Sequence, residues 1–135
     1  MKEREQIIAD YFESWIYKNK PVLAKTFAPD IIYTECYGPE YHGLAAIEQW
    51  FDDWNTKGTV LCWEIKQFIH QGSSTAVEWY FQCEYESEIG DFDGVSLIEF
   101  NAGNRIVRLK EFQSKTPHYY PYGENEAAAG SASDN

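Results

Sequence analysis

The sequence predicts a single α+β domain in which helices come first and a curved antiparallel sheet follows. Before about residue 55, most apolar residues recur at the three- and four-residue spacing of amphipathic helices, with one strand between the helices. From Val60 onward, apolar and polar residues alternate at the two-residue period of strands. The later segments are joined by short connections, which favour antiparallel pairing and a sheet covered by helices on one face.

Three helices are expected in the first part of the chain. The first spans residues 3–18, and the second begins at Pro21 and ends near residue 28, before Pro29. Gly43 introduces the third helix, whose apolar residues lie on one stripe. That stripe consists of Leu44, Ile47, Trp50, Phe51 and Trp54.

Five strands are expected around and after these helices. Residues 30–37 form the first, which is closed by the turn residues Gly38 and Pro39. The other four are residues 60–70, 75–86, 93–101 and 105–115, with turns at 71–74, 89–92 and 101–104. In the strand 75–86, Val77, Trp79, Phe81 and Cys83 would face inward, and Glu78, Tyr80 and Gln82 would cover the outer face.

Composition excludes several classes of function. The net charge of −11 and the lack of clustered Lys and Arg argue against nucleic-acid binding and against an anionic membrane surface. No run of about 18 apolar residues exists that could span a membrane, and the charged amino terminus is not a signal peptide. Three widely spaced cysteines fit reduced thiols in a cytoplasmic protein. Aromatic residues make up 17 % of the chain, which favours either a cavity or an interface.

The order of these elements resembles the nuclear transport factor 2-like superfamily, and its SnoaL-like branch most closely. The resemblance covers residues 4 to 116 and rests on the helix that opens with GLAAIEQWF and the strands DGVSLIEFNAGNRIVRLKEF. It implies a cone-shaped, cystatin-like fold, with three N-terminal helices packed on a curved, mainly antiparallel sheet around an apolar pocket. Residues 1–122 would form this SnoaL-like domain, and the small, polar residues 123–135 a disordered tail.

Ketosteroid isomerases are the members of that superfamily with which the chain aligns without a gap from Asp10 to Gly38. The resemblance assigns Tyr11 as the tyrosine that binds an oxyanion and Glu35 as the carboxylate that moves a proton. The family's second oxyanion donor, a protonated aspartic acid, is replaced by Ser96. Two supporting tyrosines are replaced by Phe27 and Phe51, so steroid isomerisation itself is not expected.

Further residues are candidates for lining the pocket. If residues 30–37 form a strand, Glu35 shares a face with Tyr33, and lies either in the pocket or on a solvated face. Glu111 is either a second acid/base group or a core carboxylate that satisfies an internal hydrogen bond. Four tryptophans are either pocket walls or packing: Trp50, Trp54, Trp63 and Trp79. The ligand-binding residues we expect are Trp15, Tyr33, Trp54, Trp63, Ser96, Ile98, Glu111 and Gln113.

Three functions are compatible with this pattern. The first is a cofactor-independent enzyme that moves a proton on a small hydrophobic molecule, as cyclases, isomerases and dehydratases do, with Glu35 as base and Tyr11 as donor. The second is a binding module without chemistry, and the third is a protein-interaction module that uses the outer sheet face. By analogy with the superfamily, that face would form a homodimer. No cofactor motif and no spacing of metal ligands is present, so neither a cofactor nor a metal is expected.

Overall fold

The computed structural model describes residues 1–123 as three helices and one six-stranded sheet. The prediction of an α+β fold is confirmed. The helices are α1 (Lys2–Ile16), α2 (Val22–Thr26) and α3 (Leu44–Asn55). The strands are β1 (Phe27–Thr34), β2 (Glu40–His42), β3 (Gly58–Gln71), β4 (Ser74–Tyr85), β5 (Glu88–Phe100) and β6 (Ile106–Lys115).

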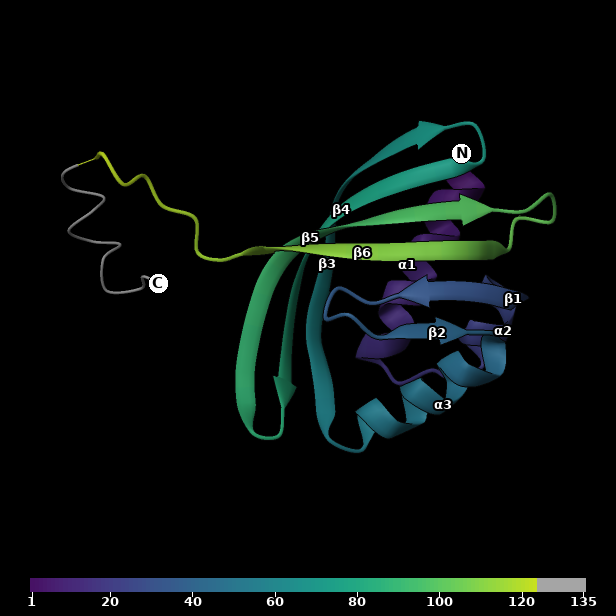
Figure 1. Ribbon diagram of the computed structural model, residues 1–135, viewed down its shortest axis with the longest axis horizontal. Helices are drawn as coiled ribbons and strands as arrows, with labels where there is room; N and C mark the ends of the chain where they lie inside the picture. The colour runs from purple at the N-terminus through teal and green to yellow at the C-terminus, as the bar shows by residue number, and fades with distance from the viewer. Residues whose placement is uncertain (124–135) are drawn as a thin grey trace.

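The strands are arranged in the order β2-β1-β6-β5-β4-β3. All neighbours are antiparallel except β1 and β6, which run parallel because the chain crosses the whole sheet between them. Figure 1 shows the long strands β3, β4 and β5 twisting and bending strongly along their length. The sheet stays open, and its curvature leaves a concave face on one side.

All three helices lie on that concave side (Figure 1). α1 packs against β3, and α3 packs against β1. The apolar stripe of α1 is buried at Ile8, Tyr11, Phe12 and Trp15, the three- and four-residue spacing that the sequence predicts. None of the helices in residues 1–123 is long and apolar enough to cross a membrane.

The chain around Glu35 differs from the prediction. β1 begins at Phe27, earlier than expected, and ends at Thr34, so Glu35 follows the strand instead of lying within it. A tight turn succeeds it, in which the Gly38 N–H donates to the Glu35 carbonyl (3.0 Å). The turn leads into β2, a three-residue edge strand that the sequence did not predict because it is too short to show a period.

The turn between β4 and β5 was predicted at the wrong place. The chain reverses at Glu86 and Ser87, both with positive φ (50° and 70°), and residues 89–92 belong to β5. A two-residue hairpin needs this left-handed backbone, which usually recruits Asn or Gly. Glu86 and Ser87 are not residues from which such a turn is predicted. Gly90 is such a residue, but it lies inside β5.

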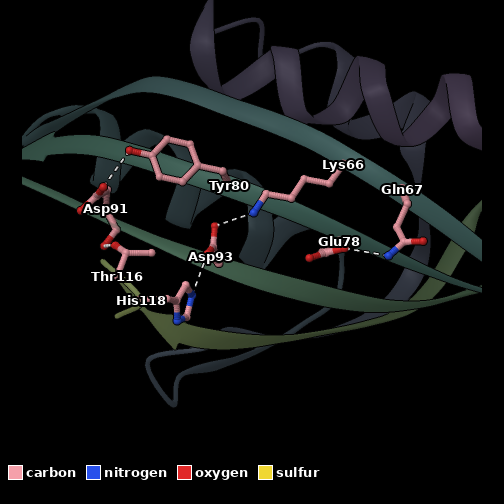
Figure 2. Close-up of polar contacts among 8 residues, drawn as sticks. All are labelled: Lys66, Gln67, Glu78, Tyr80, Asp91, Asp93, Thr116 and His118. Carbon is pink, nitrogen blue, oxygen red and sulfur yellow. Dashed lines mark hydrogen bonds and ion pairs between the residues drawn. The ribbon is translucent and has the colours of Figure 1, made fainter. Parts of the chain in front are cut away.

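The outer, convex face of the sheet carries a polar network (Figure 2). Asp93 on β5 accepts from Lys66 of β3 (2.9 Å) and is bonded to His118 (2.9 Å), which lies beyond β6. The Tyr80 hydroxyl donates to Asp91 (2.7 Å). His118 thus fastens the segment after β6 to this face, while the following residues run away from the body of the fold (Figure 1). The predicted tail, apart from Gly123, lies outside the described residues.

Trp79 reaches the concave face because β5 has a glycine opposite it. The two residues are paired across β4 and β5. A Cβ atom at Gly94 would lie 2.3 Å from the Trp79 ring and 2.6 Å from the Phe112 carbonyl oxygen. The indole therefore lies flat against the backbone of β5, and its N–H donates to Ser96 (2.9 Å).

We predict that Gly94→Ala lowers the free energy of unfolding by about 1–3 kcal/mol, because the added methyl group overpacks the Trp79 ring. Urea denaturation followed by tryptophan fluorescence measures the change. Gly90→Ala is the matched control on the same strand, since nothing lies within 4 Å of a Cβ there. Equal stability of the two variants would contradict the close packing of Trp79 on β5.

Candidate active site

A cavity of about 960 Å³ opens between the concave face of the sheet, α3 and the turn after β1. Its walls are mainly aromatic and come from α1, α3, β1, β3 and β4. The side chains that dominate them are Trp15, Tyr33, Trp50, Trp54, Trp63 and Trp79. All four tryptophans left open between wall and packing by the sequence therefore line the cavity, and Trp15 lines it too.

Glu35 lies on the wall of this cavity and is half-buried. The turn after β1 fixes its backbone, since the Glu35 N–H donates to the Pro39 carbonyl (2.8 Å). Among the described residues, no side-chain hydrogen bond reaches its carboxylate. Burial raises the pKa of Glu35 to about 7, because a charged carboxylate loses its water shell there.

Glu111 of β6 is the second carboxyl group of the cavity and is almost fully buried. Its Oε2 atom accepts a hydrogen bond from the Tyr33 hydroxyl (2.5 Å), and the backbone N–H of Cys36 also donates to it. Burial raises the pKa of Glu111 to about 7, the hydrogen bond from Tyr33 opposes this, and the charge of Glu35 adds to it. The two carboxyl groups therefore titrate as an interacting pair.

A chain of hydrogen bonds runs from α1 to Glu111. The Trp15 indole donates to the Tyr11 hydroxyl (3.0 Å), which donates to the Tyr33 hydroxyl (2.7 Å). Because an indole N–H can only donate, every hydrogen along this chain points toward Glu111. Burial and the nearby charge of Glu111 hold the pKa of both tyrosines well above its usual range, so the phenols keep their protons.

The predicted site residues separate into two groups. Glu35, Glu111, Trp15, Tyr33, Trp54 and Trp63 line the cavity. Tyr11 is fully buried behind its wall and reaches it through Tyr33. Ser96 accepts the Trp79 N–H in the core, and Ile98 is buried in the core. Gln113 continues the face of Glu111 along β6 but is exposed, because the strand runs past the end of the cavity there.

The sequence missed several lining residues. Cys36 would lie on the opposite face from its neighbour Glu35 if both were in a strand, but both line the cavity because the strand ends at Thr34. Burial raises the pKa of the Cys36 thiol to about 12, so it remains a neutral thiol. Tyr41 of the unpredicted β2 stacks on Trp50 (4.6 Å between ring centres). Asp53 and Lys57 also line the cavity. The only signal for them in the sequence is that Asp53 lies in the third predicted helix.

Within residues 1–123, no three His, Cys, Asp or Glu side chains are arranged to hold a metal ion. The protein groups available for chemistry in the cavity include the Glu35 and Glu111 carboxyl groups and the Tyr33 phenol. These groups can accept and donate protons on a bound molecule.

The fold is of the nuclear transport factor 2-like, ketosteroid isomerase-like type, as the solved structures that resemble the chain show. An LEH-like epoxide hydrolase from M. tuberculosis has a TM-score of 0.74 at 11 % identity, and the match covers 84 % of both chains. A protein with a ketosteroid isomerase-like fold from Catenulispora acidiphila, in complex with trimethylamine, has a TM-score of 0.71 at 18 % identity. The match covers 80 % of this chain and 85 % of that one. A SnoaL-like polyketide cyclase candidate from Mesorhizobium loti has a TM-score of 0.65 at 23 % identity. The match covers 80 % of this chain and 97 % of that one.

The SnoaL-like domain model matches residues 8–109, so the chain belongs to the SnoaL-like domain family. No curated protein matches the chain in sequence. The resemblance inferred from the sequence is thereby confirmed at the level of family and fold. The three solved structures are all below 25 % identity, so they show the fold alone.

Because the pKa of Glu111 is raised in the folded chain, its ionisation should oppose folding. Between about pH 4.5 and 7, the folded chain holds a proton that the unfolded chain has lost. Raising the pH across that window therefore favours the unfolded chain. We predict that Glu111→Gln gains stability relative to the wild type between pH 5 and pH 8, by on the order of 2 kcal/mol.

Urea denaturation at a series of pH values measures this difference. The Gln variant keeps an oxygen that can accept the Tyr33 hydrogen bond, so the change isolates the charge. Glu88→Gln, which removes an exposed carboxylate at the start of β5, is the control for removal of charge alone. A difference that stays constant or shrinks as the pH rises would contradict a desolvated Glu111.

Proposed function

We propose that the cavity binds a small, largely hydrophobic molecule and that Glu35 and Glu111 catalyse cofactor-independent proton transfer on it, in a reaction of the cyclase, isomerase or dehydratase type. One observation carries this proposal. Two of the carboxyl groups that line this aromatic cavity, those of Glu35 and Glu111, each have a pKa raised to about 7 by burial. An acid and a base with pKa values near the working pH are the most efficient proton carriers.

The two carboxyl groups suit different roles. Glu35, whose carboxylate has no side-chain hydrogen bond within residues 1–123, is free to take a proton from carbon. Glu111 is held by Tyr33 and by the Cys36 N–H, so its position is fixed and it suits the return of a proton. Tyr11, expected as a direct donor to the ligand, acts instead through Tyr33 and keeps that phenol oriented. In this proposal Tyr11 is a positioning residue.

The names of the fold neighbours support reaction on a small molecule, since they include an LEH-like epoxide hydrolase and a polyketide cyclase candidate. One neighbour was solved in complex with trimethylamine, which adds a small organic amine to the ligands worth testing. The substrates of these proteins are not transferred to this chain. What supports the proposal is the pair of carboxyl groups.

A chemical probe tests the base without knowledge of the natural substrate. In 5-nitrobenzisoxazole, a base removes the proton from carbon 3, the N–O bond breaks, and a coloured cyano-nitrophenolate forms. We predict that the protein accelerates this reaction beyond an equal concentration of acetate, because a desolvated carboxylate is a stronger base. The rate should rise with pH through about 7 as Glu35 loses its proton.

Glu35→Gln should lower the rate of this reaction by about 10- to 100-fold, and Glu88→Gln should leave it unchanged. Absorbance of the released phenolate measures the rate. Retention of the full rate by Glu35→Gln would remove Glu35 as the base. A wild-type rate no higher than that of acetate would contradict the proposal as a whole.

A second proposal, for a homodimer, rests on the convex face of the sheet. Strand register places Ile69, Ala76 and Leu97 in one row, next to a row with Val95 and Phe112. Ile69, Leu97 and Phe112 are 61 %, 48 % and 50 % exposed. An apolar patch of this kind beside the polar network of Figure 2 is typical of an interface. We propose that it joins two copies of the chain, which is also the basis of the alternative, non-catalytic interaction function.

Leu97→Arg should convert this dimer to a monomer, because the rotation axis of a symmetric interface places two like charges opposite each other. Light scattering coupled to gel filtration measures the mass. Glu99→Arg, on the same strand and face, controls for the added charge. A wild-type chain that is monomeric at high micromolar concentration would contradict the proposed homodimer.

A further inference from the structure

The cavity contains an imbalance of charge. Among residues 1–123, three carboxyl groups line it, those of Glu35, Asp53 and Glu111, and the single cationic side chain on its wall is Lys57. Within the part of the chain that the structure describes, neither Glu35 nor Glu111 forms an ion pair with Lys, Arg or His. Buried carboxylates are normally paired with a cation or kept neutral. Glu35 and Glu111 therefore have no cationic partner among residues 1–123, although Lys57 lies elsewhere on the cavity wall.

The aromatic walls around these carboxyl groups are not parallel. The Trp15 ring is inclined by 57° to that of Trp50 and by 89° to that of Trp54. The Tyr33 ring meets Trp50 at 61°, while Tyr41 stacks on the same indole. These rings pack against one another in inclined and stacked pairs, and the cavity wall that they form, which we call the aromatic cage, presents both π-faces and edges.

Aromatic faces and carboxylates attract the same kind of ligand. The negative face of an aromatic ring binds a cation, most strongly for tryptophan, and a carboxylate adds direct attraction. An alkylated ammonium group matches both features, because its charge is spread over an apolar surface that loses little on leaving water. A metal ion would need oxygen, nitrogen or sulfur ligands in a tight group, and residues 1–123 offer no such group. An anion would be repelled by Glu35 and Glu111.

We propose that the ligand of this cavity is a small organic cation, a molecule whose tertiary or quaternary ammonium group lies between the aromatic cage and the carboxylates of Glu35 and Glu111. This inference rests on the proposed function only in taking the cavity as the ligand site. It adds the class of ligand. The bound cation supplies the missing counter-charge and thereby favours the ionised form of both carboxyl groups.

Choline and its uncharged carbon isostere, 3,3-dimethyl-1-butanol, form a matched pair of probes, because they share their shape and differ in charge. We expect choline to bind at least tenfold more tightly at pH 8, as measured by isothermal titration calorimetry and by quenching of tryptophan fluorescence. The anion 3,3-dimethylbutanoate, a third molecule of similar shape, should bind most weakly.

Variants connect this preference to the cavity. The double variant Glu35→Gln with Glu111→Gln should lose most of the preference for choline yet keep its affinity for 3,3-dimethyl-1-butanol, which also shows that the cavity is intact. Trp50→Leu should weaken choline binding more than binding of the alcohol. Glu88→Gln, outside the cavity, should change neither affinity. A circular dichroism spectrum and a urea midpoint establish that each variant is folded.

The possible outcomes separate the two proposals. Equal affinity for choline and the alcohol, tighter binding of the anion, or no binding of choline at all would overturn the cationic ligand. Each of these results leaves the carboxylate base to be judged by the 5-nitrobenzisoxazole reaction. Persistence of the choline preference in the double Gln variant would also overturn the inference, because the charge would then act from elsewhere.

Discussion

The carboxylate of Glu111 is buried at the base of the cavity, and three separate elements are arranged to hold it there. Its hydrogen bond from Tyr33 joins β6 to β1, and the bond from Tyr11 to Tyr33 joins β1 to α1. A buried carboxylate without such donors would cost several kcal/mol. The hydrogen-bond chain therefore helps to fix where the first helix lies on the sheet, and at the same time points the proton of Tyr33 at the Glu111 carboxylate.

The open, twisted sheet explains why a cavity remains. Its long strands curve around the side on which the helices lie, and large rings line the space that remains without filling it. Gly94 allows Trp79 to lie against the strand instead of projecting into the cavity. The aromatic lining removes water from Glu35 and Glu111, which raises the pKa of both groups toward neutrality. The shape of the cavity and the raised pKa of its two glutamates thus both result from the aromatic composition of the chain.

Periodicity was sufficient to predict the helices, the long strands and the inward face of β4, because each buries a continuous stripe that leaves a pattern. It failed where local geometry lacks a pattern. The Glu86–Ser87 turn has left-handed residues without Asn or Gly, and β2 is too short to alternate. Glu35 and Glu111 could be predicted as candidates from the family resemblance and strand faces. The bond from Tyr11 to Tyr33 could not, because it depends on how α1 is rotated on the sheet.

Titration of the two cavity carboxyl groups by carbon-13 NMR tests the central claim most directly. With glutamate labelled at the side-chain carboxyl carbon, comparison of the wild type with Glu35→Gln and Glu111→Gln assigns the two signals. Both should titrate near pH 7 in the wild type, and Glu111 should titrate at lower pH once Glu35 is neutral. Titration of both groups near the ordinary value of about 4.5 would contradict a desolvated, proton-carrying pair.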